Sequence, residues 1–298
     1  KEPVSAGIVA KLLKDHDCKA ILNTTAFAIG TPDKSNAGPF AELDVPVFQV
    51  VLSSSTQEAW ASNPQGMGPR DVTMHVSMPE IDGRILTRAV SFKSGGQRHE
   101  PTQCYLTRYE AARDRAAWVA QLAANWVKLQ AAKNADKKLA IVLANYPNKD
   151  GRLANGVGLD TPASAAELIK ALASQGYEIG PSPTDGQTLI ETLAAGATNN
   201  LDRARNGERI SVADYHTWFD TLPETAQQEL TARWGEPIAD PFVEGLDFVL
   251  PFQLWGNLAV GIQPARGYNI DPEKSYHDPD LIPPHGYLAS YLWLRQQF

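Results

Sequence analysis

The sequence has few of the features that mark secreted, membrane-spanning or nucleic-acid-binding proteins. Its 298 residues include only two cysteines, Cys18 and Cys104, which cannot build a disulfide framework and lack the spacing of a zinc site. No apolar run approaches the ~20 residues of a membrane helix, and the net charge of -7 argues against a surface that neutralises phosphates. We therefore expect a cytoplasmic protein without membrane or nucleic-acid partners.

Glycine-rich nucleotide motifs are also incomplete. Gly156 and Gly158 lack the third glycine of the dinucleotide pattern, and no Gly-Lys-Ser/Thr sequence ends a phosphate-binding loop. The loop that contains these glycines either makes tight turns at positive φ or grips carboxylates through Lys149 and Arg152. We expect no tightly bound nucleotide on this chain.

Apolar runs alternate with helical periodicities, which predicts an α/β fold. Residues 94–103 have the composition of a linker and place a boundary between an N-terminal lobe, 1–103, and a second lobe, 104–298. The second lobe carries a helical insertion and a proline-rich C-terminal loop. We expect two linked Rossmann-like lobes with mostly parallel sheets and additional helices. The expected strands are 20–25, 45–52, 138–144 and a pair at 248–250 and 258–262, and the expected helices are 106–133, 161–176, 184–194, 212–221 and 224–233.

Polar residues follow two of the expected strands. Residues 53–55, all serines, either line a ligand crevice at the carboxyl edge of the sheet or cap the next helix. The loop 145–160 is longer than the ~2–6 residues usual for such connections, which favours a functional loop. It ends where Thr161 and Pro162 provide an N-cap and a proline at the first helical position.

The C-terminal segment 263–287 concentrates proline, histidine, arginine and tyrosine. Proline fixes the backbone and removes donors, so the polar side chains of this segment must face a cleft, water or a ligand. His277 and His285 could converge on one point or serve as hydrogen-bonded structural residues. Arg266 either binds a substrate carboxylate or forms an ion pair with Asp271 or Asp278.

Several short motifs together resemble one family. They are residues 45–51 (VPVFQVV), 69–71 (PRD), 79–85 (PEIDGRI), 143–152 (LANYPNKDGR), 158–164 (GLDTPAS), 263–272 (QPARGYNIDP) and 276–279 (YHDP). The chain resembles the CobN-type large subunits of aerobic cobaltochelatase and the related large subunits of magnesium chelatase. The form of the two C-terminal motifs is more similar to the cobalt branch.

The resemblance implies a nitrogen–metal ligase that inserts Co²⁺ into a corrin precursor, hydrogenobyrinic acid a,c-diamide, on the aerobic route to cobalamin. It implies that ATP and Mg²⁺ act on separate AAA+ ATPase and adaptor subunits. It further implies that the chain is part of a longer subunit, which continues after Phe298 into a motif with histidine and glutamate. We expect the fragment alone to be inactive.

The candidate site residues come from the residue patterns and from the family resemblance. The catalytic candidates are His285, His277 and Glu80, and the resemblance makes His285 the candidate metal contact at the edge of the cleft. The substrate-binding candidates are Arg266, Tyr268, Gln263, Asn145, Tyr146, Asn148, Lys149 and Arg152. Alternatives are a magnesium chelatase subunit that binds protoporphyrin, a non-catalytic two-lobe binding protein, and a scaffold for the ATPase partners.

Overall fold

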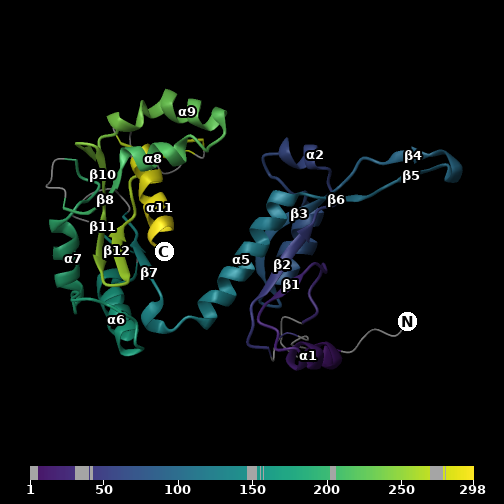
Figure 1. Cartoon of the computed structure of the whole chain (residues 1–298), viewed down its shortest axis with the longest axis horizontal. Helices are drawn as coiled ribbons and strands as arrows, with labels where there is room; N and C mark the ends of the chain where they lie inside the picture. Colours follow the sequence, from purple (N-terminus) through teal and green to yellow (C-terminus); the bar gives the residue numbers. More distant parts are fainter. Residues whose placement is uncertain are drawn as a thin grey trace. The chain divides into compact units, whose positions relative to one another are not determined.

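The chain divides into two compact units, Lys1–Ala131 and Ala132–Phe298 (Figure 1). The computed structural model describes residues 6–30, 40, 43–145, 153–154, 156, 158–201, 206–268, 278 and 280–298. The boundary that we expected after residue 103 therefore lies inside the first unit.

The first unit is built on a four-stranded sheet of order β1-β2-β3-β6. Its strands are β1 (Ile21–Asn23), β2 (Val47–Leu52), β3 (Ile85–Lys93) and β6 (Tyr109–Ala111). The first three strands are parallel, and β6 runs antiparallel to β3. Around the sheet are α1 (Ala6–Asp15), α2 (Gln57–Ala61), α3 (Pro69–Val72), the π-helical turn η1 (Thr73–Ser77), α4 (Met78–Glu80) and α5 (Arg113–Ala131).

The core of the first unit is small. Val51, Ala89 and Phe92 are buried on the sheet, and the Trp60 ring lies 5.2 Å from the Phe92 ring. Along α5, Val119 is buried, whereas Trp126 is 38% exposed. Helix α5 thus contributes only some of its apolar side chains to the interior of its own unit.

A β-hairpin occupies the segment that we predicted to be a linker followed by the start of a long helix. Strands β4 (Gln97–His99) and β5 (Cys104–Leu106) pair antiparallel around the short helix η2 (Glu100–Thr102). A side chain at Gly96 would lie 3.0 Å from the Leu106 carbonyl oxygen, so the glycine permits the close approach of the two strands. The helix begins only at Arg113.

The second unit contains two three-stranded sheets. One sheet has the order β11-β12-β7, with β11 (Phe252–Trp255), β12 (Leu258–Ile262) and β7 (Leu139–Leu143). The other has the order β8-β10-β9, with β8 (Glu208–Ser211), β10 (Asp247–Leu250) and β9 (Val243–Glu244). Of these pairings, only β7–β12 is parallel. The expected strands at 248–250 and 258–262 are confirmed as parts of β10 and β12, but they do not pair with each other, because they belong to different sheets.

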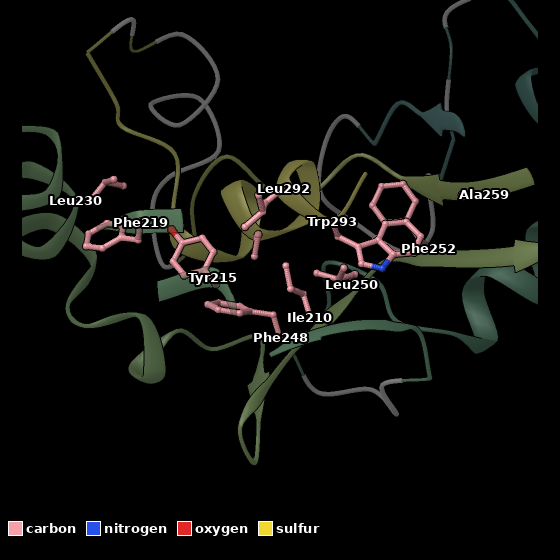
Figure 2. Close-up of a cluster of buried hydrophobic side chains, with 11 residues drawn as sticks. Ile210, Tyr215, Phe219, Leu230, Phe248, Leu250, Phe252, Ala259, Leu292 and Trp293 are labelled. Carbon is pink, nitrogen blue, oxygen red and sulfur yellow. The ribbon is translucent and has the colours of Figure 1, made fainter. Parts of the chain in front are cut away.

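Helices pack on these sheets in two hydrophobic cores. The helices are α6 (Thr161–Ser174), α7 (Gly186–Ala195), α8 (Val212–Phe219), α9 (Glu224–Trp234) and α11 (His285–Gln297), with the short η3 (Asn134–Asp136) and η5 (Pro237–Ala239). The side chains of Ile169 and Leu193 join β7 and β12 in one core. Figure 2 shows the other core, in which Trp293 of α11 stacks on Phe252 at 5.4 Å.

Two expected helix caps are corrected. Asp160, not Thr161, caps α6, because its carboxylate accepts from the Ala163 amide at 3.1 Å. Thr56 caps α2 by accepting from Ala59, which leaves residues 53–55 to other partners.

The mixed α/β class is confirmed. The expectation of mostly parallel sheets is wrong. Among the described strands, three pairings are parallel and lie in two sheets, whereas five are antiparallel and are spread over all four sheets. The Rossmann-like character of each lobe stays a prediction.

Candidate functional site

Asn145 lies two residues beyond β7, at the carboxyl edge of the parallel pair β7–β12. It is only 5% exposed, and within the described part of the chain neither its Nδ2 nor its Oδ1 has a hydrogen-bond partner. Native proteins pair the large majority of such buried groups, because an unpaired one costs about 1–3 kcal/mol. The Asn145 amide is therefore available to a water molecule or a ligand group.

Gln263 lies at the same edge of the sheet, directly after β12. Its backbone amide donates to the Leu143 carbonyl oxygen at 2.8 Å, which extends the parallel ladder by one residue. Asn199 fixes the following turn by donating to the Gln263 carbonyl oxygen and accepting from the Ala265 amide. The sequence around Asn199 carries no signal for this role, because its partners lie 64 and 66 positions away in the chain.

Asp240 organises the segment before α11. Its carboxylate accepts from the backbone amides of Phe242 at 2.9 Å and Gly286 at 3.0 Å, and from the Tyr268 hydroxyl at 3.3 Å. Burial raises the pKa of Asp240, although these hydrogen bonds act in the opposite direction. Asp240 thus holds the start of α11 and Tyr268 against the turn at 240–242.

His285 is fully buried at the first position of α11. Its Nε2 lies 3.0 Å from the Gly235 carbonyl oxygen and must donate to it, so in the neutral ring Nδ1 is an acceptor, 2.9 Å from the Tyr215 hydroxyl. Burial lowers the pKa of His285, which favours this neutral form. The structure therefore gives His285 internal partners and no place on an open cleft, and a metal contact would require one of these bonds to break.

Arg266 and Tyr268, in the segment after β12, are both half-buried. The Arg266 Nη2 donates to the Leu281 carbonyl oxygen at a long 3.5 Å, and among the described carboxylates none forms an ion pair with it. Tyr268 packs its ring 4.7 Å from that of Trp234. Most donors of the Arg266 guanidinium thus have no partner within the described part of the chain.

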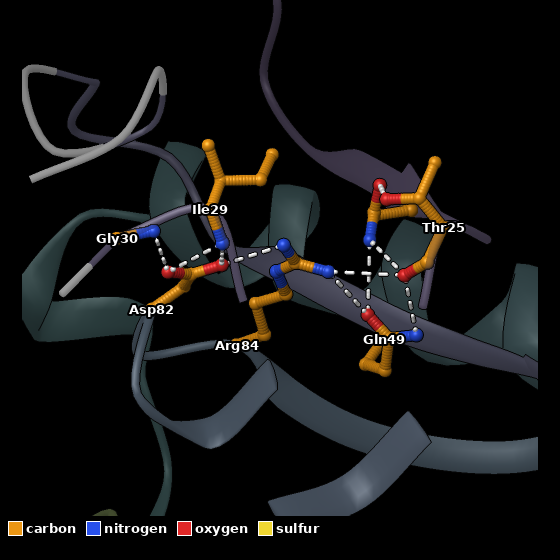
Figure 3. A network of polar contacts seen from close by, with 7 residues as sticks. Thr25, Ile29, Gly30, Gln49, Asp82 and Arg84 are labelled. Carbon is orange, nitrogen blue, oxygen red and sulfur yellow. Dashed lines mark hydrogen bonds and ion pairs between the residues drawn. The ribbon is translucent and has the colours of Figure 1, made fainter. Parts of the chain in front are cut away.

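Glu80 ends α4 in the first unit and is exposed. Asp82 is instead buried with Arg84 in an ion pair of 2.5 Å, and it also accepts from the backbone amides of Ile29 and Gly30 (Figure 3). The Asp82 carboxylate therefore does more than form the turn that the Asp-Gly sequence predicts.

The serines after β2 bind Asp71 of α3. The hydroxyls of Ser53 and Ser54 donate to its carboxylate at 2.8 Å and 2.7 Å. Burial acts to raise the pKa of Asp71, but these hydrogen bonds outweigh it and hold the pKa below its usual value. Neither alternative that we considered for the serines describes this arrangement.

The remaining candidates, His277, Tyr146, Asn148, Lys149 and Arg152, lie outside the described residues. Within the described part, no three histidine, cysteine, aspartate or glutamate side chains gather as a metal site. The same part contains no helix that is both long and apolar enough to cross a membrane.

Comparison with known proteins decides the family. Residues 3–298 match the family profile described as CobN/Magnesium Chelatase. The chain belongs to this family. It is 47% identical to the aerobic cobaltochelatase subunit CobN of Sinorhizobium sp and 45% identical to that of Pseudomonas aeruginosa, in each case over 100% of the chain and 24% of the relative. The chain thus spans about a quarter of the length of these relatives.

A more distant relative and a solved structure agree with this membership. A magnesium-chelatase subunit of Rhodobacter capsulatus is 27% identical over 93% of the chain and 24% of its own length. The catalytic subunit of cobaltochelatase from Mycobacterium tuberculosis matches 99% of the chain and 25% of its own, with a TM-score of 0.81 and 35% identity. The fold described above is therefore a fold of this family.

Proposed function

We propose that the chain is a substrate-binding part of the large subunit of an ATP-dependent cobaltochelatase. The substrate would be hydrogenobyrinic acid a,c-diamide, and the inserted metal would be Co²⁺. The observation that carries the cobalt branch is the identity of 47% and 45% to two cobaltochelatase subunits, against 27% to a magnesium chelatase subunit.

The chemistry of metal insertion sets the tasks of the protein. Two ring N–H protons must leave, the aquated metal must lose water, and the macrocycle must distort to admit it. A positioned ring lowers the entropic part of this barrier. Binding groups for the amide and carboxylate side chains of the ring are therefore as necessary as a proton acceptor.

The second unit offers suitable binding groups. Arg266 has guanidinium donors that match a carboxylate, and Asn145 presents an unpaired donor and an unpaired acceptor, among the described residues, that match a primary amide. The half-buried Gln263 side chain follows β12 at the same sheet edge as Asn145. We assign ring recognition to these three side chains.

The candidates for the proton acceptor differ in exposure. Glu80 of the first unit is exposed, as suits an acceptor that exchanges protons with solvent. His285 would first have to release Tyr215 or Gly235. His277 keeps its place among the candidates from the sequence.

We assign the energy source to other chains. ATP and Mg²⁺ would bind AAA+ ATPase and adaptor subunits that act with this subunit in the cytoplasm. A magnesium chelatase role with protoporphyrin is the nearest alternative, and a scaffold for the ATPase partners is the alternative from another class.

Spectral titration of the full-length subunit tests the proposal. We expect hydrogenobyrinic acid a,c-diamide to shift its absorption on binding and protoporphyrin to bind at least tenfold more weakly. A shift for protoporphyrin alone would support the magnesium alternative, and a shift for neither would support the scaffold. With partners and ATP, the full-length subunit should insert Co²⁺, whereas residues 1–298 should not.

A further inference from the structure

The backbone just before Arg266 is fixed to the sheet of the second unit that contains β7 and β12. The Gln263 amide donates to the carbonyl oxygen of Leu143, the last residue of β7, at 2.8 Å. The Asn199 side chain donates to the Gln263 carbonyl oxygen at 3.0 Å and accepts from the Ala265 amide at 2.9 Å. Ala265 is only 5% exposed. The chain therefore reaches Arg266 from a defined position.

The backbone just after Arg266 is fixed by Tyr268. The Tyr268 hydroxyl donates to the Asp240 carboxylate at 3.3 Å. The Tyr268 ring lies 4.7 Å from the ring of Trp234 and 6.4 Å from that of Phe242. The Tyr268 hydroxyl therefore already has an acceptor inside the protein, and its ring has aromatic neighbours.

The acceptor of this hydrogen bond, Asp240, is itself held in place. Asp240 is 3% exposed, and its carboxylate accepts from the backbone amides of Phe242 at 2.9 Å and Gly286 at 3.0 Å. Gly286 lies in the first turn of α11, and a Cβ atom there would come within 3.1 Å of the Asp240 Oδ1 atom. The glycine thus permits the close approach, and Tyr268 is tethered to the start of α11.

The Arg266 side chain, in contrast, has little of its own to hold it. Within the described part of the chain, its guanidinium makes one hydrogen bond, from Nη2 to the Leu281 carbonyl oxygen at 3.5 Å. An arginine side chain loses about 2 kcal/mol of rotamer entropy when it is fixed. The direction of the guanidinium therefore depends mainly on the backbone from which it extends, and that backbone is held on both sides.

We infer that Tyr268 and Asp240 are positioning residues for Arg266. Their hydrogen bond holds the backbone of the segment so that the guanidinium meets a substrate carboxylate without rearrangement of the chain. The inference rests on the proposed function, which gives Arg266 that carboxylate. A group that is oriented before binding loses less entropy on binding, so the hydrogen bond adds to affinity without touching the ligand. The three residues all belong to the second unit.

Tyr268→Phe tests the hydrogen bond, because it removes the hydroxyl and keeps the ring beside Trp234. In the full-length subunit, we expect the affinity for hydrogenobyrinic acid a,c-diamide to fall about fivefold, as for the loss of one hydrogen bond. The unfolding temperature should change by less than about 3 °C, since Asp240 keeps its two backbone donors. Tyr291→Phe is the matched control, because it removes a hydroxyl that is hydrogen-bonded to Tyr287 within α11, and it should bind as the wild type does.

A double-mutant cycle with Arg266→Ala separates positioning from direct contact. Once the guanidinium is absent, Tyr268→Phe should lower the remaining affinity by less than about twofold, because nothing is left for it to position. A similar loss in both backgrounds would mean that Tyr268 acts on the ligand or on the fold independently of Arg266, and it would overturn the inference. Wild-type affinity in the single variant Tyr268→Phe would overturn it as well.

The same titrations distinguish this inference from the proposed function. If the wild-type subunit binds no tetrapyrrole, the proposed function fails, and the positioning role fails with it. If the wild type binds and Arg266→Ala binds equally well, Arg266 is not a substrate contact and has nothing to be positioned for. If Arg266→Ala binds weakly while Tyr268→Phe binds normally, only the positioning role fails, and the proposed function stands.

Discussion

The hydroxyl of Tyr215 lies 2.9 Å from Nδ1 of His285, across 70 positions of sequence and inside the core of the second unit. Because His285 Nε2 donates to the Gly235 carbonyl oxygen, the Tyr215 hydroxyl is the donor in this bond. The pair joins α8 to the first turn of α11. It therefore positions the helix that follows the proline-rich segment.

Tyr215→Phe should destabilise the second unit without creating a large cavity. The substitution removes one oxygen and leaves the buried Nδ1 of His285 without a donor, which should lower the free energy of unfolding by about 1–3 kcal/mol. Urea denaturation checks this value. Tyr105→Phe, which changes an exposed tyrosine, should change it by less than about 0.5 kcal/mol. Equal effects of the two substitutions would contradict the role of the pair.

Stability should also depend on pH through His285. Burial lowers its pKa in the folded protein below the ordinary value of 6.5, so between these two pKa values the unfolded chain binds more protons. The contribution of neutral His285 is therefore complete above about pH 6.5 and is lost as pH falls. The raised pKa of Asp240 makes stability depend on pH in the opposite direction. Because Asp240 is present in both wild type and His285→Gln, we compare the difference between these two proteins. The difference in unfolding free energy between wild type and His285→Gln should shrink from pH 7.5 to pH 5, and a constant difference would contradict this.

The structure explains which features the sequence could predict. Helices α6, α8 and α9 and strand β7 appear near their predicted positions, because each depends on local periodicity and turn residues. The hairpin β4–β5 was missed, since its exposed residues carry no alternation of apolar and polar side chains. Local signals also placed the cap of α6 one residue late, at Thr161 instead of Asp160.

The site was less predictable than the fold, because its contacts are distant in sequence. Asn199 meets Ala265 across 66 positions, and Asp240 meets Gly286 across 46. Neither Asn199 nor Asp240 belongs to a motif that indicates such a contact. The sequence could nominate Asn145 from its place after a strand, but only the structure reveals that its amide is buried and, among the described residues, unpaired.

Asp82→Asn should destabilise the first unit strongly. The substitution leaves the Arg84 guanidinium buried without its carboxylate, and the side chains of Arg84 and Asp82 are only 0% and 4% exposed. Breaking such a pair from one side costs about 3–5 kcal/mol of unfolding free energy. Asp17→Asn is the control, because its ion pair with Lys19 is exposed and should contribute at most about 1 kcal/mol. A loss below about 1 kcal/mol for Asp82→Asn would show that solvent reaches Arg84.

Asn145→Leu should separate folding from binding. The Asn145 amide has no partner among the described residues, so an apolar side chain of similar size removes an unpaired group and should leave the unfolding free energy equal or about 1 kcal/mol higher. Tetrapyrrole affinity should fall. Asn199→Leu is the matched control, since it breaks two backbone contacts and should be destabilising. A strongly destabilised Asn145→Leu variant would mean that the amide has a structural partner after all.

Arg266→Ala should weaken substrate binding more than it weakens the fold. Among the described residues, the guanidinium has one long hydrogen bond, to Leu281, so its loss should change the unfolding temperature little. If Arg266 holds a carboxylate of the ring, its removal should cost about 1.5–3 kcal/mol of binding free energy in the full-length subunit. Arg266→Lys should recover only part of this affinity, because lysine keeps the charge but loses the planar fork. Titration with hydrogenobyrinic acid a,c-diamide measures both variants, and early melting with unchanged affinity would instead assign Arg266 to holding the segment around Leu281.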